Sequence, residues 1–248
     1  MSATVLYMST SLDGFIAGPN ETPENGLGDG GHRLHQWSPN PDPDRKVTSG
    51  YLAGVNRQVQ AEAMATGAVV AGRGTFEPAG GWDGDHHDGV PIFILTRHDP
   101  DDLRQWPLVS YLSDVTSAMT QAKEAAGDKN VMVQGAGTAQ LAIAAGVLDE
   151  LELHVIPVLF GQGRRLFEGL AAEQIELERT RVLEGEGGVT HMHYRVRRWT
   201  GRGRWASSPP GAYSRTPQNP TRSLRDQKRQ QERPLEPSAS QHRLRRGR

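Results

Sequence analysis

One stretch of the chain constrains the fold more than any other. It is an apolar run, residues 131–134, which breaks at Gly135-Ala136-Gly137 and continues as an alanine- and leucine-rich segment up to Gly146. Such a pattern is typical of a buried β-strand that leads through a glycine turn into a helix. Glycines at the turn let a ligand approach the bare backbone N–H groups, and the positive end of the helix favours phosphate. The pattern therefore predicts an α/β protein that binds a nucleotide.

Other apolar runs alternate with helical patterns along the chain ahead of its basic end. Asp114 can cap a helix that Gly127 would stop, and the glycine-rich residues 185–188 suit a hairpin turn. Strands that alternate with helices before a closing hairpin predict a mixed sheet with helices on both faces. We expect strands at 4–9, 68–71, 91–96, 109–112, 131–134, 151–156, 175–183 and 189–196, and helices at 47–64, at 115–126 and after 137.

A long polar loop, residues 19–43, follows the first predicted strand and contains four glycines. A loop of this length inside a compact domain is uncommon unless it is functional or disordered. Because it comes directly after the first strand, we interpret it as a loop that covers a site rather than as a linker.

The charge of the chain is unevenly distributed. Residues 201–248 hold 12 of the 28 Lys and Arg residues but only 3 of the 29 Asp and Glu residues. This segment is rich in Pro, Ser, Gln and Arg, and its few aliphatic side chains cannot offset the entropy of the chain. We predict a folded domain over 1–200 and a disordered basic tail over 201–248. The tail either contacts nucleic acid or another acidic partner or is a solvated extension.

Several classes of protein are excluded or disfavoured. The absence of cysteine excludes disulfides, thiolate metal sites and cysteine nucleophiles. No segment resembles a signal peptide or a membrane span, so we expect a cytoplasmic protein. His191 and His193 would share one face of a strand, and His86, His87 and Asp88 lie in a loop, but neither set has a third ligand at a suitable spacing. We therefore expect no metal. The nucleophile elbow of α/β-hydrolases is also missing.

Six motifs, taken in order, resemble those of the dihydrofolate reductase superfamily, and more closely its branch that contains the RibD C-terminal reductase domain of riboflavin biosynthesis. They are residues 11–18, 72–75, 95–97, 134–138, 146–151 and 157–163, within a region of similarity over 3–198. The resemblance implies a three-layer α/β/α fold whose mostly parallel central sheet has an antiparallel C-terminal edge hairpin. It also implies an NADPH cofactor, hydride transfer to a C=N or C=O carbon of a small heterocyclic substrate, and a homodimer.

The resemblance also assigns the cofactor-binding residues. The turn at 72–75 would hold the cofactor phosphates, and the turn at 135–138 would lie beneath the diphosphate and the nicotinamide. Thr96 and Arg97 would lie near the 2′-phosphate that distinguishes NADPH from NADH, which favours NADPH. A Rossmann fingerprint does not fit, because Gln140 occupies the place of its third glycine. The expected set is Ala17, Gly18, Gly72, Arg73, Thr75, Thr96, Arg97, Gly135, Ala136, Gly137 and Thr138.

The substrate side is less defined. Dihydrofolate reductases place one carboxylate on the helix after the loop, and no acid of this chain aligns there. Asp29 and His35 are candidate substrate residues, although each also fits a solvated loop position. The reaction of the resembling branch, reduction of 5-amino-6-(5-phosphoribosylamino)uracil, does not need that carboxylate. The alternatives are a dihydrofolate-type pterin reductase and a non-catalytic nucleotide-binding scaffold with a polyanion-binding tail.

Overall fold

The computed structural model describes residues 2–22, 24–38, 54–170, 174–199 and 205–206 of the 248-residue chain. Apart from residues 205–206, the predicted basic tail lies outside the described residues, as do residues 47–53 of the first predicted helix. A short ribbon of β11 (Arg198–Trp199) and β12 (Trp205–Ala206) crosses the predicted domain boundary at residue 200. The two domain ranges stay predictions.

An eight-stranded sheet forms the centre of the domain, with the strand order β5-β4-β3-β6-β1-β7-β10-β9. The strands from β5 to β7 pair in parallel, and β10 is antiparallel to both β7 and β9. The predicted parallel sheet with an antiparallel C-terminal hairpin is thus confirmed. In chain order, the strands are β1 Thr4–Ser11, β3 Ala68–Gly72, β4 Ile92–Leu95, β5 Val109–Leu112, β6 Val131–Gln134, β7 Glu150–Ile156, β9 Leu177–Glu184 and β10 Thr190–Val196.

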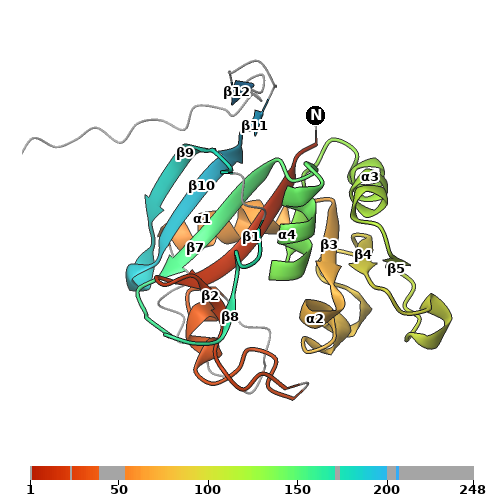
Figure 1. Ribbon diagram of the computed structural model, residues 1–248, viewed down its shortest axis with the longest axis horizontal. Coiled ribbons are helices and arrows are strands. Elements are labelled where there is room, and N and C mark those ends of the chain that lie inside the picture. The colour runs from red at the N-terminus through yellow and green to blue at the C-terminus, as the bar shows by residue number, and fades with distance from the viewer. Residues whose placement is uncertain (1, 23, 39–53, 171–173, 200–204, 207–248) are drawn as a thin grey trace, which may run out of the picture. The chain divides into compact units, whose positions relative to one another are not determined.

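Helices cover both faces of this sheet, which confirms the three predicted layers. In the view of Figure 1, α3 (Val115–Ala126) and α4 (Ala136–Ala144) lie in front of the sheet, and α1 (Gly54–Met64) lies behind it. Met119 of α3 and Ala139 of α4 share the largest core cluster with Val70 and Val133. Because side chains alternate along a strand, the central strands need apolar residues for both faces. Their continuous apolar runs meet that need.

The short helix α2 (Arg73–Phe76) packs behind the sheet, where Phe76 joins Val69 and Ala71 in a second core cluster. α3 has the bounds that its capping residues predict. The Asp114 carboxylate accepts a hydrogen bond from the Ser117 backbone N–H at 2.7 Å, and the helix stops at Gly127. The remaining helical turns are η1 Gly31–His35, η2 Gly80–Gly84, η3 Pro100–Asp102 and η4 Glu186–Gly188.

The loop after the first strand differs from the prediction of a long polar loop. Its described part contains η1, and the side chains of Leu34 and Trp37 are buried beneath it. In addition, β2 (Phe15–Ala17) pairs with β8 (Arg164–Arg165) in a small separate sheet. The strands β2 and β8 have only three and two residues, and η1 is a short 3₁₀ helix of five, so none of them shows a period from which the sequence could predict it. None of the described helices is long and apolar enough to cross a membrane.

Candidate cofactor and substrate site

Two glycine turns, distant in the sequence, meet at the carboxyl edge of the sheet. Because β3 and β6 are adjacent parallel strands, the turns that follow them lie side by side. A Cβ at Gly135 would overlap the Thr75 hydroxyl, and a Cβ at Gly72 would lie 3.2 Å from Thr138 Oγ1. Gly135 also has a φ of 89°, which a residue with a side chain adopts only with strain. We call Gly72, Thr75, Gly135 and Thr138 the glycine cradle.

The hydroxyl of Thr138 is the most informative atom of the cradle. Thr138 is only 3% exposed, and its Oγ1 has no hydrogen-bond partner in the described part of the chain. An unpaired buried hydroxyl costs about 1–3 kcal/mol, so native structures seldom leave one without a function. Thr138 lies in the first turn of the nine-residue helix α4, whose leading N–H groups have no partner within the helix. Together these donors suit the oxygens of a phosphate.

Two arginines that the sequence assigns to phosphate binding lie at the same edge. The Arg73 Nε pairs with Glu77 Oε1 at 2.6 Å, which holds the guanidinium against the end of α2. Arg97 follows β4, the neighbour of β3, and its side chain is exposed. Arg97 and Thr96 line a cavity of about 380 Å³ together with residues of the segment from Tyr111 to Ser117. The structure therefore brings all three predicted phosphate-binding segments to one edge of the sheet.

Ala17 and Gly18 reach this region through the small sheet. A Cβ at Gly163 would overlap the Ala17 carbonyl oxygen and Gly18, so the chain before β8 packs tightly against them. The next residue, Arg164, places its guanidinium Nη1 3.3 Å from where a Cβ of Gly74 would lie. Arg164 was not among the residues predicted from the sequence, because its position depends on the pairing of β2 with β8.

The two predicted substrate residues have different surroundings. The Asp29 carboxylate is exposed and accepts hydrogen bonds from the Nδ2 atoms of Asn20 at 2.7 Å and Asn25 at 3.3 Å. The Asp29 carboxylate therefore stabilises the loop to which it belongs. His35 is half-buried in η1, where burial, together with the nearby His32, lowers its pKa to about 4. His35 is accordingly neutral near pH 7.

A buried polar network, which the sequence did not predict, lies between the sheet and α1. Asn56 Nδ2 donates to the Glu186 carbonyl oxygen at 3.1 Å, which fixes the orientation of the amide. Asn56 Oδ1 must then accept from His191 Nε2 at 3.0 Å, so His191 Nδ1 accepts from His154 Nδ1 at 2.9 Å. Burial lowers the pKa of His191 to about 4 and that of His154 well below its ordinary value. We call Asn56, His154 and His191 the histidine network.

Trp37 connects the histidine network to β1. Its ring centroid lies 4.2 Å from that of His154, and its Nε1 donates to Ser9 Oγ at 2.8 Å. Met8, the neighbour of Ser9 on β1, accepts a hydrogen bond through Sδ from the Gly135 backbone N–H at 3.3 Å. The network and the cradle therefore contact successive residues of β1, on opposite faces of the sheet, because side chains alternate along a strand.

The helix after the loop carries no acid at the described start of its sequence. Its first turn presents Asn56, and its single acid, Glu62, pairs through Oε2 with Arg181 Nη2 at 2.7 Å. This explains why no carboxylate aligned with the one that dihydrofolate reductases use. The side chain at that end of the helix is a neutral amide.

The structure also describes the histidines that the sequence analysis considered as metal ligands. His191 and His193 do face the same side of β10, and both are buried. Among the described residues, one group of possible metal ligands, formed by Glu152, His154 and His191, has ligand atoms within 4.8 Å of one another. The hydrogen bonds of the histidine network already engage both ring nitrogens of His191. The absence of a metal stays a prediction.

Comparisons with known proteins agree with this geometry. The family model of the RibD C-terminal domain matches residues 4–190. A putative riboflavin biosynthesis protein from Shewanella sp. PV-4 is 21% identical, with a TM-score of 0.56, over 79% of this chain and 99% of that one. No curated protein matches the chain.

Two further solved structures share the fold. The diaminohydroxyphosphoribosylaminopyrimidine deaminase/5-amino-6-(5-phosphoribosylamino)uracil reductase of Thermotoga maritima is 14% identical, with a TM-score of 0.50, over 79% of this chain and 56% of that one. Acinetobacter baumannii RibD is 15% identical, with a TM-score of 0.51, over 79% of this chain and 58% of that one. The chain thus spans little more than half the length of these two relatives. The family match, which covers most of the chain, shows that the protein belongs to the RibD C-terminal domain family and is an oxidoreductase.

Proposed function

We propose that the protein is an NADPH-dependent reductase of the riboflavin-biosynthesis type, which transfers a hydride to a C=N or C=O carbon of a small heterocyclic substrate. The observation that carries the proposal is the glycine cradle with the hydroxyl of Thr138, which has no hydrogen-bond partner among the described residues. A Cβ at Gly135 would overlap the Thr75 hydroxyl and one at Gly72 would crowd that of Thr138, so the two glycines leave both hydroxyls in place to meet a phosphate. The residues present therefore fit the cofactor.

Each part of the site has a role toward a dinucleotide. The N–H groups at the start of α4 and the hydroxyls of Thr75 and Thr138 would bind the diphosphate oxygens. Arg97, at the mouth of the cavity after β4, would pair with the 2′-phosphate. When bound, NADPH supplies the hydride, while the protein supplies orientation and a dry pocket.

The lack of an acidic side chain on the described first turn of α1 supports a ribosylaminopyrimidine rather than a pterin as the substrate. The described first turn of α1 carries no acid of its own, and burial keeps His154 and His191 uncharged near pH 7. The Glu186 carboxylate does stand at that end of the helix, but it accepts a hydrogen bond from the Asn56 backbone N–H at 3.2 Å and so is engaged as a cap. An uncharged pyrimidine ring needs hydrogen bonds to its N–H and C=O groups rather than an ion pair with a carboxylate. The name of the Thermotoga maritima relative, a 5-amino-6-(5-phosphoribosylamino)uracil reductase, agrees with this substrate class.

The test is NADPH oxidation by the full-length protein with 5-amino-6-(5-phosphoribosylamino)uracil and, in parallel, with dihydrofolate. We expect turnover with the pyrimidine and at most slow turnover with dihydrofolate. Oxidation with dihydrofolate alone would overturn the substrate assignment. Polyanion binding without any turnover would favour the non-catalytic scaffold.

Cofactor choice can be tested separately by equilibrium binding. An Arg97→Gln variant should weaken NADPH binding about tenfold or more while NADH binding stays the same, because only NADPH carries the 2′-phosphate. Arg104→Gln is the matched control, since the Arg104 guanidinium stacks over the Trp106 ring at 3.6 Å. Equal losses for both cofactors would exclude Arg97 from the 2′-phosphate site.

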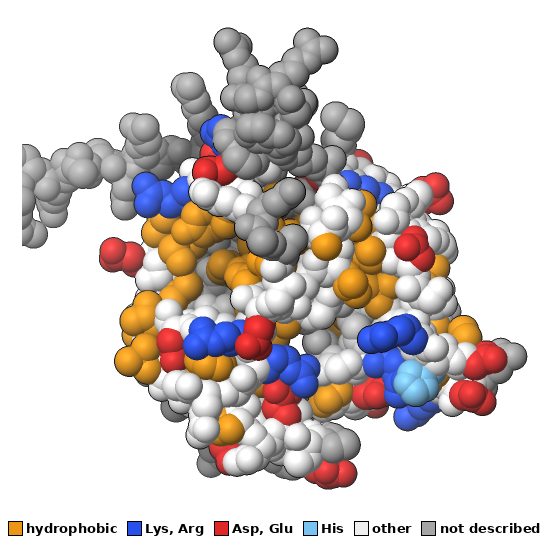
Figure 2. Space-filling model, in the orientation of Figure 1, with side chains coloured by type: hydrophobic (Ala, Val, Ile, Leu, Met, Phe, Trp, Pro, Cys, Tyr) orange, Lys and Arg blue, Asp and Glu red, His pale blue; other side chains and the backbone are white. Residues whose placement is uncertain are grey.

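A homodimer remains part of the proposal. Leu153, Met192 and Val182 are directly paired across β7, β10 and β9 on the face that α3 and α4 leave free, since these helices lie over β3, β4 and β6. Figure 2 shows hydrophobic side chains on this side of the domain, and Val182 is 44% exposed. Light scattering after Val182→Glu should show a shift from dimer to monomer; an unchanged mass would remove this face as the interface.

A further inference from the structure

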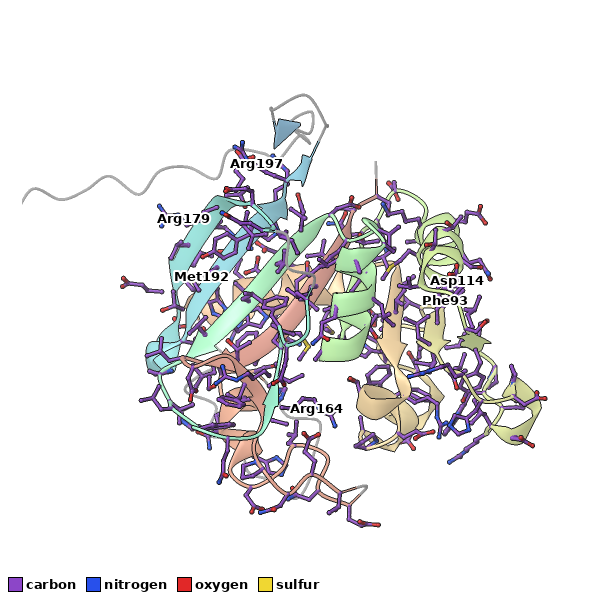
Figure 3. All side chains as sticks on the ribbon, in the orientation of Figure 1. Phe93, Asp114, Arg164, Arg179, Met192 and Arg197 are labelled. Carbon is purple, nitrogen blue, oxygen red and sulfur yellow. The ribbon has the colours of Figure 1, made fainter. Side chains whose placement is uncertain are left out.

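Arg164 connects two segments of the site that are far apart in the sequence. It lies on β8 opposite Ala17 of β2, and in Figure 3 its side chain points from β8 toward α2. One guanidinium nitrogen, Nη1, lies 3.3 Å from where a Cβ of Gly74 would stand, and the other, Nη2, pairs with Glu21 Oε2 at 2.7 Å. The same guanidinium therefore contacts the turn after β3 and the loop after β2.

The surroundings of Arg164 fit an anion better than they fit Glu21 alone. Gly74 has no side chain, so the guanidinium reaches the backbone between Gly72 and Thr75, the part of the turn that belongs to the glycine cradle. The cradle also holds the buried hydroxyl of Thr138, which has no partner in the described chain. Figure 2 shows basic side chains gathered over β8 and beside α2. A planar guanidinium is the side chain best matched to phosphate oxygens.

The ion pair between Arg164 and Glu21 is exchangeable. The Arg164 side chain is 45% exposed and that of Glu21 is 19% exposed, so water screens the pair on one side. Exposed pairs of this kind contribute little to stability, whereas a guanidinium that binds phosphate forms stronger, charge-assisted hydrogen bonds. A phosphate at the cradle would therefore compete successfully for Arg164.

We propose that Arg164 is a further anchor for the diphosphate of the cofactor and that Glu21 occupies it in the free protein. Binding exchanges the Glu21 carboxylate for a phosphate oxygen and frees Glu21 from β8. This inference rests on the proposed use of NADPH, and it adds a binding residue that the six sequence motifs do not assign to the cofactor.

The experiment measures equilibrium dissociation constants for NADPH with the full-length protein and three variants, Arg164→Gln, Glu21→Gln and Arg165→Gln. Arg165 is the matched control, because it is the next residue of β8 and is equally basic. Its guanidinium packs over the Phe15 ring at 4.3 Å and donates to the Asp13 carbonyl oxygen at 3.1 Å. Thermal unfolding without cofactor checks that each variant is folded.

We expect Arg164→Gln to weaken NADPH binding about tenfold to a hundredfold and Arg165→Gln to leave it unchanged. Glu21→Gln should tighten binding about threefold, because the competing carboxylate is gone. Equal affinities for Arg164→Gln, Arg165→Gln and the unmodified protein would overturn the anchor, and weaker binding by Glu21→Gln would overturn the exchange. No NADPH binding by the unmodified protein would instead contradict the proposed function.

Discussion

Replacement of Thr138 by valine should stabilise the free protein and weaken its binding of NADPH. Valine has the same shape as threonine but lacks the hydroxyl, which is buried and has no partner within the described chain. Removing an unpaired buried hydroxyl recovers part of a desolvation cost of about 1–3 kcal/mol, so the free energy of unfolding should rise by about 1 kcal/mol. Loss of one hydrogen bond to a charged phosphate should weaken NADPH binding about tenfold to a hundredfold.

The matched control is Thr66→Val. Thr66 is also buried, but its hydroxyl donates to the Ala63 carbonyl oxygen at 2.8 Å. Its replacement should therefore cost about 1 kcal/mol of stability and leave the affinity for NADPH unchanged. Urea unfolding and fluorescence titration measure both quantities. If Thr138→Val destabilised the protein as Thr66→Val does and bound NADPH normally, the hydroxyl would have no role in cofactor binding.

Three further changes test other parts of the account. Gly135→Ala should destabilise the domain by about 1–3 kcal/mol and abolish NADPH binding, because a Cβ there would overlap the Thr75 hydroxyl and Gly135 has a φ of 89°. An unchanged affinity for NADPH would show that the cradle has room for the added methyl group. Asp114→Ala should lower the free energy of unfolding by about 1 kcal/mol through loss of the cap on Ser117, and a change below about 0.3 kcal/mol would contradict that role. Burial, opposed by Arg181, raises the pKa of Glu152 from 4.5 to about 7. Its contribution to stability is thus present at low pH and lost as the pH rises through that range. The change in the free energy of unfolding caused by Glu152→Gln should therefore be more stabilising at about pH 8 than at about pH 5, by up to about 3 kcal/mol. An equal change at both pH values would refute the shifted pKa.

The buried histidines titrate in the opposite direction. Burial lowers the pKa of His35, His86, His191 and His193 to about 4. Their contribution to stability is therefore complete above about pH 6.5 and is lost as the pH falls toward 4. The summed effect of these four histidines on the free energy of unfolding exceeds the opposite effect of Glu152. The free energy of unfolding should therefore decrease on acidification through this range. A stability that rose between about pH 6.5 and pH 4 would contradict this assignment.

The sequence predicted the parts of the fold that depend on local patterns. The central strands are continuous apolar runs, and α3 has both a capping aspartate and a stop glycine, so their bounds could be read directly. The pairing of β2 with β8 and the short turn η1 depend on contacts between distant segments, which periodicity does not report. The central sheet could therefore be predicted from local patterns, whereas the prediction for the loop after the first strand missed the short elements within and beside it.

The candidate site divides in the same way. Gly72 and Gly135 stand out in the sequence because a glycine between a strand and a helix marks a tight turn or a close approach to the backbone, and the structure brings their turns together. Arg164 looks like an ordinary surface arginine until β8 is placed. The histidine network draws Asn56, His154 and His191 from three separate elements, so no spacing in the sequence could reveal it.

The most direct test of the account is a crystal structure of the protein with NADPH. We expect the diphosphate between the turns at 72–75 and 135–138, with Thr138 Oγ1 and the Arg164 guanidinium within hydrogen-bond distance of its oxygens and the adenosine 2′-phosphate beside Arg97. A cofactor bound elsewhere, with the Thr138 hydroxyl still unpaired, would contradict the central claim that these turns form one dinucleotide site.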